Sequence, residues 1–181
     1  MAFRSHCTNT LIIVKNNSII MPFVVTHMLV PMILVDVFRD KILKIKKSKL
    51  PNRYILIAGL AGLFPDIDLL FGKFIAHRTI THSIWLPLAF LFFSSIFYLI
   101  KKYGWSKISL MIFIGTGTHI IFDLVTAGSI PLFYPVSNTL FGVNLIPPGS
   151  TVFVYSAMDA VLLWIWFFRK MVFGKRIEDV V

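Results

Sequence analysis

Eight ionisable side chains lie in or beside the most apolar stretches of the sequence, and they divide equally between histidine and aspartate. They are His27, Asp66, Asp68, His77, His82, His119, Asp123 and Asp159. An ionisable residue at membrane depth is costly, so each one is a functional hypothesis by default. Imidazole and carboxylate together suit one or two divalent metal ions, zinc first, with manganese or iron as alternatives. The pattern predicts a metal centre for which all eight are candidate ligands.

Local spacing supports this interpretation. His119 and Asp123 are four residues apart, which places both on one face of a helix. Pro65 disfavours a helical Phe64, so the backbone should bend or break before Asp66-Ile67-Asp68; in an extended segment both carboxylates would point to the same side. Each pattern also has a structural alternative, namely a buried His–Asp pair or a solvated helix end.

The segment from His77 to His82 brings two imidazoles close to Arg78. This combination suits metal ligation together with contact to an anion, and its alternative is a polar interfacial turn that caps the next helix. A metal ion would activate a bound water as a nucleophile, and Arg78 could bind a phosphate oxygen or stabilise developing negative charge. We therefore predict catalytic roles for Asp68, Arg78 and His82. The single cysteine, Cys7, excludes a thiolate metal cluster.

The elements that must position these residues are apolar. The chain has 181 residues, of which 57% are hydrophobic and 14% charged, against roughly 25% charged in an ordinary soluble domain. Five stretches approach the roughly 20 residues that cross a bilayer, and they are 20–38, 54–72, 82–100, 108–128 and 152–171. We predict an all-α, polytopic transmembrane bundle of about five spans, forming one domain over 21–173 with an inner tail at 174–181.

Residues 1–20 fit this scheme badly, because their apolar core is too short for a signal peptide. We expect translation to begin at Met21, and the alternative is a disordered or interfacial N-terminal extension.

The placement of basic residues predicts the orientation of the bundle. Lys and Arg number 18 and Asp and Glu number 8, and fourteen of the basic residues fall on one side when the spans alternate. By the positive-inside rule the N-terminus lies outside and the C-terminus in the cytoplasm, in the plasma (inner) membrane. The basic clusters are then topology signals and contacts for anionic lipid, and no nucleic-acid partner is expected. This topology places all eight candidate ligands within roughly 15 Å of the outer boundary.

The uncharged stretch 128–149 is apolar and rich in Pro and Gly. Irregular backbone in lipid must be shielded, so we expect an outer lid over the polar cluster whose aromatic residues guide acyl chains. A belt of aromatics that anchors the interface is the alternative.

The ordered set of motifs resembles one family. Thr26-His27, the sequence LFPDID ending at Asp68, HRTITHS ending at Ser83, GTHIIFD ending at Asp123, and Asp159 together resemble the YdjM-like membrane-bound, metal-dependent hydrolases. The resemblance runs from Met21 to Asp159, with Thr79 where the family has Gly. It implies a hydrolase of the inner or plasma membrane with His and Asp metal ligands.

The sequence therefore predicts a membrane-bound metal-dependent hydrolase that acts on a lipid or lipid-linked ester or phosphoester. Two alternatives remain: a transporter that moves a metal ion or protons through the same cluster, and a non-catalytic scaffold stabilised by metal. A transport path should continue to the inner side, where Asp36 is the only acid in an inner half-span. The sequence leaves the substrate, the metal and the oligomeric state undetermined.

Overall fold

The helices match the predicted apolar stretches. A computed structural model of the chain describes residues 23–39, 50–71, 79–126, 129–143, 145–146 and 150–174. Within these ranges the fold is all-helical, with the α-helices α1 (Phe23–Val37), α2 (Asn52–Gly62), α3 (Trp85–Leu99), α4 (Tyr103–Thr126) and α5 (Thr151–Gly174). Two 3-10 helices, η2 (Phe64–Phe71) and η3 (Ile80–His82), complete the set. The proposed translation start and the inner tail beyond Gly174 lie outside the described residues.

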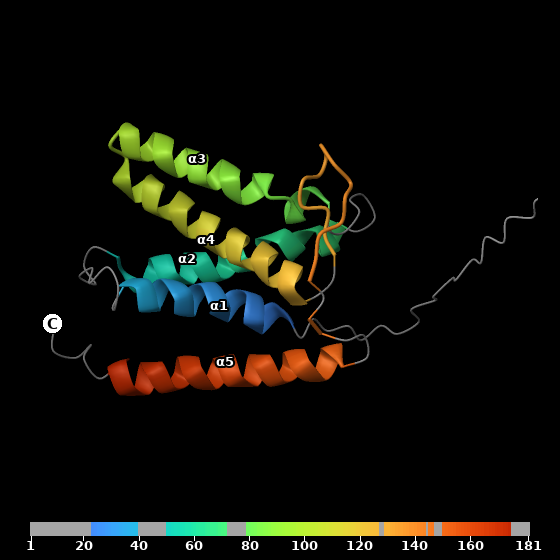
Figure 1. Cartoon of the computed structure of the whole chain (residues 1–181). Helices are drawn as coiled ribbons and strands as arrows, with labels where there is room; N and C mark the ends of the chain where they lie inside the picture. The colour runs from blue at the N-terminus through green and yellow to red at the C-terminus, as the bar shows by residue number, and fades with distance from the viewer. Residues whose placement is uncertain are drawn as a thin grey trace, which may run out of the picture.

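Consecutive α-helices run in alternating directions (Figure 1). The turn between α3 and α4 is short because Lys101 takes a positive φ of 60°, and Lys102 N–H donates to Phe97 O at 2.8 Å. In this bundle α4 packs against α3, α2 and α1, whereas α5 packs mainly against α1. The connections 50–51 and 100–102 therefore lie at one end, and η2 and η3 lie at the other (Figure 1).

The predicted break before Asp66 is present, but the segment after it is not extended. The α-helical part of the second stretch ends at Gly62, and the chain continues as the 3-10 helix η2. Pro65 lacks a backbone N–H and disfavours α-helical backbone at the residue before it, which accounts for the change. Asp66 and Asp68 consequently lie on a tight helix rather than on one side of a strand.

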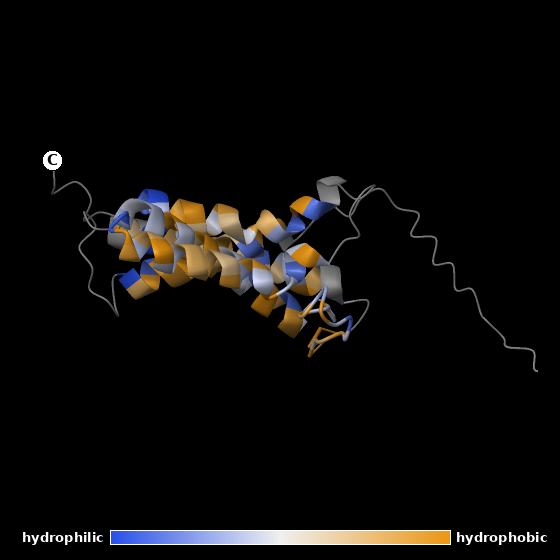
Figure 2. Cartoon of the chain, turned by 90° about the horizontal axis from the view of Figure 1, so that it is seen from above, coloured by the Kyte–Doolittle hydropathy of each residue, from blue (hydrophilic) through white to orange (hydrophobic). Residues whose placement is uncertain are grey.

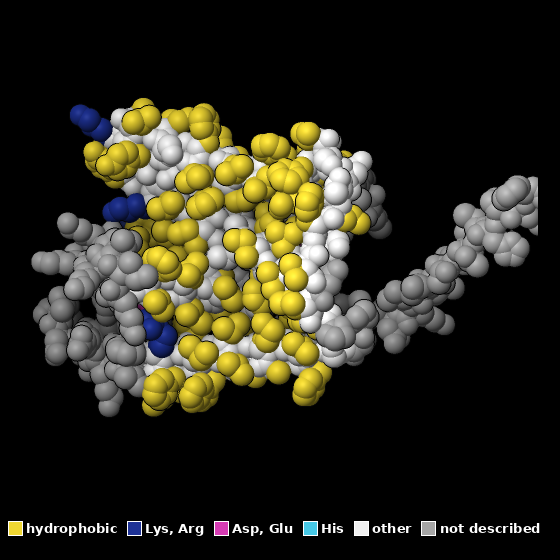
Figure 3. All heavy atoms as spheres, in the orientation of Figure 1, with side chains coloured by type: hydrophobic (Ala, Val, Ile, Leu, Met, Phe, Trp, Pro, Cys, Tyr) yellow, Lys and Arg dark blue, Asp and Glu magenta, His cyan; other side chains and the backbone are white. Residues whose placement is uncertain are grey.

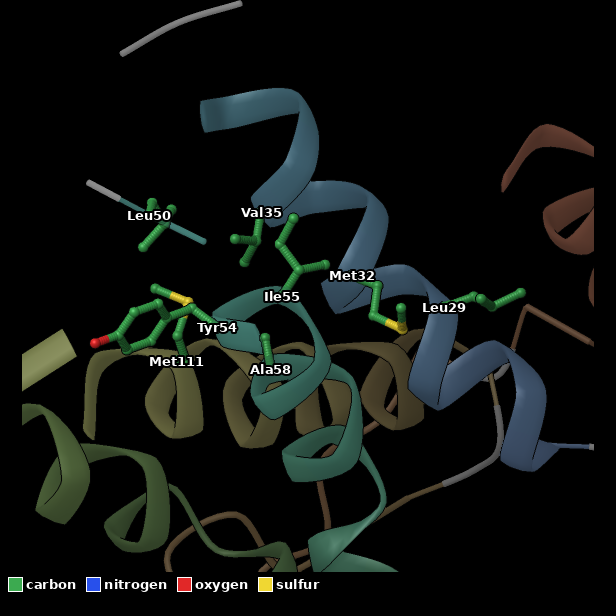
Figure 4. Packing of buried hydrophobic residues seen from close by; sticks show 8 residues of the cluster. All are labelled: Leu29, Met32, Val35, Leu50, Tyr54, Ile55, Ala58 and Met111. Atoms are coloured by element: carbon green, nitrogen blue, oxygen red, sulfur yellow. The ribbon is translucent and has the colours of Figure 1, made fainter. Parts of the chain in front are cut away.

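The apolar core lies between α1, α2 and α4 and closes the middle of the bundle. Figure 4 shows its buried side chains, which are Leu29, Met32, Val35, Leu50, Tyr54, Ile55, Ala58 and Met111. Close approach of the helices depends on two glycines. A Cβ on Gly115 would collide with Ala58 O, and one on Gly62 would collide with His27 O. These contacts bring the ends of α1, α2 and α4 together where the candidate ligands lie.

The exterior of the bundle suits a lipid environment. The helices are predominantly hydrophobic along their middle, with hydrophilic residues toward their ends (Figure 2). On the face drawn in Figure 3, apolar side chains cover the helices and the visible Lys and Arg side chains lie at the end that carries 100–102. In the described part of the chain, α4 has both the length and the hydropathy of a membrane span, and α1 and α3 are shorter apolar helices.

The predicted lid segment is described over 129–143 and 145–146, and it lies at the end of the bundle that carries η2 and η3 (Figure 1). An isolated antiparallel bridge joins Ile130 and Phe141. Val143 N–H donates to Leu124 O at 2.7 Å, and Ile84 N–H donates to Leu132 O at 2.9 Å. These bonds fix the segment beside the end of α4 and the start of α3.

Candidate metal centre

Six of the eight predicted ligands come together at the η2–η3 end of the bundle. They reach the same place from four elements: His27 from α1, Asp66 and Asp68 from η2, His82 from η3, and His119 and Asp123 from α4. The fold achieves this because α1 and α4 pack closely around Gly62, where α2 gives way to η2.

Two imidazole nitrogens form the middle of the cluster. His82 Nε2 and His119 Nε2 lie 3.3 Å apart. Asp66 Oδ1 lies 3.4 Å from the first and 3.6 Å from the second. Asp123 Oδ2 lies 3.5 Å and 3.7 Å from the same two nitrogens. Each carboxylate oxygen therefore forms a nearly equilateral triangle with the two imidazole nitrogens.

The backbone fixes the tautomer of His119. Its Nδ1 lies 2.6 Å from Gly62 O, and a carbonyl oxygen only accepts, so Nδ1 carries the proton and donates. In a neutral imidazole the other nitrogen then presents a lone pair. His119 Nε2 consequently faces the cluster as an acceptor, which is the state in which histidine binds a metal.

Hydrogen bonds between side chains fix His82 in the same tautomer, with the proton on Nδ1. Thr81 Oγ1 donates to Asp68 Oδ2 at 2.7 Å, and a hydroxyl has only one proton to donate. His82 Nδ1, which lies 3.1 Å from Thr81 Oγ1, must therefore be the donor in that second contact. Asp68 thus acts on His82 through Thr81, on the side of the ring away from Nε2, with 3.6 Å between its Oδ2 and Nδ1.

The four central atoms are better suited to bind a divalent cation than to form hydrogen bonds with one another. Neutral Nε2 atoms and carboxylate oxygens are all acceptors, so at these separations they repel one another unless a cation lies between them. For Zn–N and Zn–O bonds of about 2.0–2.1 Å, neighbouring tetrahedral ligands are about 3.3–3.4 Å apart. The observed 3.3 Å between the imidazole nitrogens matches that edge. Among the described residues, two groups have ligand atoms close enough to hold a metal ion: His82, His119 and Asp123, and His27, Asp66 and His119.

His27 borders the cluster from α1. Its ring stacks on His119 with 3.9 Å between centroids, and its Nε2 lies 3.5 Å from Asp123 Oδ1. Asp123 therefore contacts three histidines with its two oxygens, because its Oδ2 faces His82 and His119 and its Oδ1 faces His27. His27 can therefore serve as an additional ligand or as the group that orients Asp123.

Asp159 belongs to neither metal-compatible group. Its Oδ1 instead accepts a hydrogen bond from the hydroxyl of Thr26, the residue before His27. This bond ties α5 to α1 at the depth of the cluster. His77 and Arg78 lie outside the described residues.

Threonines are the functional residues that sequence reasoning missed. Each cluster histidine follows a threonine, in Thr26-His27, Thr81-His82 and Thr118-His119. Two of these hydroxyls donate to aspartates, whereas Thr118 donates to Ile114 O of its own helix at 2.8 Å. The repeated Thr-His dipeptide was the available signal. The contact between His119 and the Gly62 carbonyl could not be predicted in this way, because every residue type has a backbone carbonyl.

The opposite end of the bundle holds a different polar group. Asp36 accepts from Arg39 Nη2 at 2.5 Å and from Arg169 Nη2 at 3.1 Å. Arg39 also donates to Asn52 Oδ1 at 3.0 Å and to Leu50 O at 3.3 Å. This network joins the ends of α1, α2 and α5.

An all-helical chain with an apolar helix of spanning length and a His/Asp cluster of ligand geometry has the features of a membrane protein with a candidate metal centre. The comparison with known families gives the class a name: the chain belongs to the YdjM inner membrane protein family, whose model matches residues 21–176. No curated protein and no solved structure matches it significantly.

Proposed function

We propose that this protein is a membrane-bound, metal-dependent hydrolase that acts on a lipid or lipid-linked ester or phosphoester. The observation that carries the proposal is the convergence of two lone-pair-bearing Nε2 atoms on two carboxylate oxygens. A divalent cation held there would supply Lewis acidity and activate water at neutral pH, with zinc first and manganese or iron as alternatives.

The residues of the site divide into ligands and residues that orient them. Asp66, His82, His119 and Asp123 would bind the cation, and His27 would bind or orient beside Asp123. Asp68 and Thr81 would hold the His82 ring, as Gly62 O holds His119; such supporting groups tune metal sites strongly. Arg78 and His77, just before η3 in the sequence, remain the proposed anion-binding residue and a proposed further ligand.

Exposure indicates the side from which a substrate would approach. The Asp66 side chain is 18% exposed, whereas those of His82, His119 and Asp123 are at most 4% exposed. The surface around η2 and η3 is apolar, because Phe64, Ile67 and Ile80 are exposed. The 129–146 segment adds exposed Val136, Leu140, Val143 and Leu145. An apolar surface beside the cluster favours a lipid substrate over a water-soluble one.

The middle of the bundle argues against transport through the cluster. A path to the opposite end would have to pass the buried core of α1, α2 and α4, which is apolar (Figure 4). An ion or proton relay requires polar groups along its route. A site at one end, sealed from the other, suits catalysis on a substrate that enters from the membrane.

We further propose five spans with the cluster near the outer face, the N-terminus outside and the C-terminus in the cytoplasm. The uneven distribution of basic residues supports this orientation. In a Cys7→Ser background, Ser137→Cys should react with an impermeant thiol reagent added outside whole cells. Lys101→Cys, at the other end, should react only after the membrane is opened, and the reverse result would refute the orientation.

Metal analysis combined with lipid hydrolysis assays tests the enzyme proposal. Purified wild-type protein should contain stoichiometric divalent metal and release fatty acid or phosphate from at least one lipid class. His119→Ala should lose both, whereas Thr118→Ala should keep both, because the Thr118 hydroxyl bonds only within α4. Stoichiometric metal with no hydrolysis of any lipid class, together with ion flux in liposomes, would establish the transporter instead.

A further inference from the structure

A cavity at the end of the bundle opposite the metal centre has the properties of a lipid site. Its volume is about 270 Å³, and it is lined by Met32 of α1, by Asn52, Arg53, Ile55 and Leu56 of α2, and by Trp166 of α5. Three helices meet there, and α5 packs mainly on α1 rather than on α2. Asn52 begins α2 and Gly62 ends it, so the rim of the cavity at Asn52 lies about 15 Å along the helix from Gly62 beside the candidate metal centre.

The lining is graded from polar to apolar. Asn52 and Arg53 belong to the first turn of α2, whereas Ile55 and Leu56 lie about 5 Å deeper along its axis. Met32 and Trp166 complete the apolar wall, and tryptophan is enriched where membrane meets water. A phospholipid shows the same gradation from polar to apolar, since its phosphate lies at the interface and its acyl chains lie deeper.

The polar rim offers hydrogen-bond donors to an anion. Asn52 Oδ1 accepts from Arg39 at 3.0 Å, which leaves the Asn52 amide N–H groups as donors. The Arg53 guanidinium lies 5.4 Å from the centroid of the Tyr54 ring, and Lys107 Nζ lies 6.0 Å from the same centroid. Pro51 at the N-cap makes no side-chain cap, so the first turn of α2 also presents backbone N–H groups and the positive end of its dipole.

We propose that this cavity binds an anionic membrane phospholipid, with its phosphate at Asn52 and Arg53 and part of one acyl chain against Leu56, Met32 and Trp166. The volume is slightly below the roughly 300–1,000 Å³ of pockets that enclose a whole ligand. The cavity therefore takes one segment of a chain, and the rest of the lipid stays in the bilayer. Bound there, the lipid fills the space between α2 and α5.

Native mass spectrometry of the full-length protein, titrated with phosphatidylglycerol and phosphatidylethanolamine, tests the proposal. Phosphatidylglycerol should bind more tightly, and Arg53→Gln should weaken it about fivefold, which is the effect of one basic residue near a membrane surface. Leu56→Trp should weaken both lipids, because it fills the cavity. Lys101→Gln, which removes an exposed charge at the same end but outside the cavity, should change binding less than twofold.

Three results would overturn the proposal. Equal binding of the two lipids would show that no anion is recognised. An equal loss in Lys101→Gln and Arg53→Gln would show a diffuse basic surface rather than a site. Displacement by millimolar glycerol phosphate would show an anion site that needs no acyl chain. Metal content should stay at the wild-type level in all three variants, so this test and the test of the metal centre fail independently.

Discussion

Both ends of the bundle hold buried or partly buried carboxylates beside nitrogen-bearing side chains, but the two sets differ in how donors and acceptors are paired. At the basic end, Asp36 accepts hydrogen bonds of 2.5 and 3.1 Å from two arginines. At the other end, the oxygens of Asp66 and Asp123 lie 3.4–3.7 Å from imidazole nitrogens that present lone pairs. The first set pairs donors with acceptors, and the second places acceptors around a centre.

This difference separates a structural network from a candidate binding site. The arginine network is complete within the protein, because the guanidinium donors meet carboxylate, amide and carbonyl oxygens. The histidine cluster could hold a cation, and its tautomers are fixed by Gly62 O and Thr81 so that the lone pairs face inward. The apolar core between them lets each end be perturbed separately.

The largest effect on folding should come from the arginine network. Arg39 is 3% exposed, and Arg39→Ala leaves the partly buried Asp36 with Arg169 as its arginine partner. Removing one partner of a buried ion pair costs about 3–5 kcal/mol, and the remaining arginine places this variant near 3 kcal/mol. Denaturant unfolding in micelles measures the loss. Lys101→Ala, at an exposed position, should change the free energy of unfolding by less than about 0.5 kcal/mol.

Because the apolar core separates the two ends of the bundle, Arg39→Ala should keep the metal content of the wild type. A destabilised protein with wild-type metal stoichiometry would show that the two ends are separate, whereas loss of metal would show that they are coupled through the core.

Removing a cation from the histidine cluster should also lower the stability of the protein, independently of the arginine network. A ligand at 100 times its dissociation constant stabilises the folded state by about 2.7 kcal/mol, so a chelator should lower the free energy of unfolding by about that amount. His119→Ala should be insensitive to the chelator, while Arg39→Ala should respond as the wild type does. A wild-type protein whose unfolding ignores the chelator would remove the distinction between the two ends.

The fold was largely predictable from the sequence, because apolar stretches can be recognised without knowing which elements they pack against. All five stretches contain an α-helix, and Pro65 marked the break after α2. The boundaries moved where local chemistry intervened: α4 begins at Tyr103 rather than at 108, directly after the tight turn at Lys101.

The candidate site was predictable as a set of residues but not as an arrangement. Shared depth grouped the histidines and aspartates, and six of them meet in the structure. The direction of each side chain depends on packing between helices, so spacing could not show that Asp68 lies on the Nδ1 side of His82 or that Asp159 bonds to Thr26.

Helix packing around the cluster gives a smaller effect. A Cβ on Gly115 would lie 2.6 Å from Ala61 Cβ and would also meet Ala58 O, so Gly115→Ala must push α4 away from α2. Overpacking of this kind costs about 1–3 kcal/mol, and it should also weaken metal binding because His119 is one turn further along α4. Gly117→Ala is the matched control, since its Cβ would find its nearest neighbour at 3.9 Å. Equal metal affinity in the two variants would show that α2–α4 spacing does not position His119.

The smallest effect should come from the hydroxyl that orients His82. Thr81→Val keeps the shape of the side chain but removes the hydroxyl that joins Asp68 to His82 Nδ1. Loss of a group that orients a metal-binding histidine costs 10–100-fold in metal affinity, and about tenfold is expected here because Asp68 stays 3.6 Å away. Competition with a metal-indicator dye measures the affinity. Thr81→Ser should restore it, and Thr118→Val should leave it unchanged, because that hydroxyl serves only its own helix. If Thr81→Val bound metal as tightly as the wild type, the orientation of His82 would have to come from packing alone, and the contrast between the two ends would rest on His119 and its backbone carbonyl.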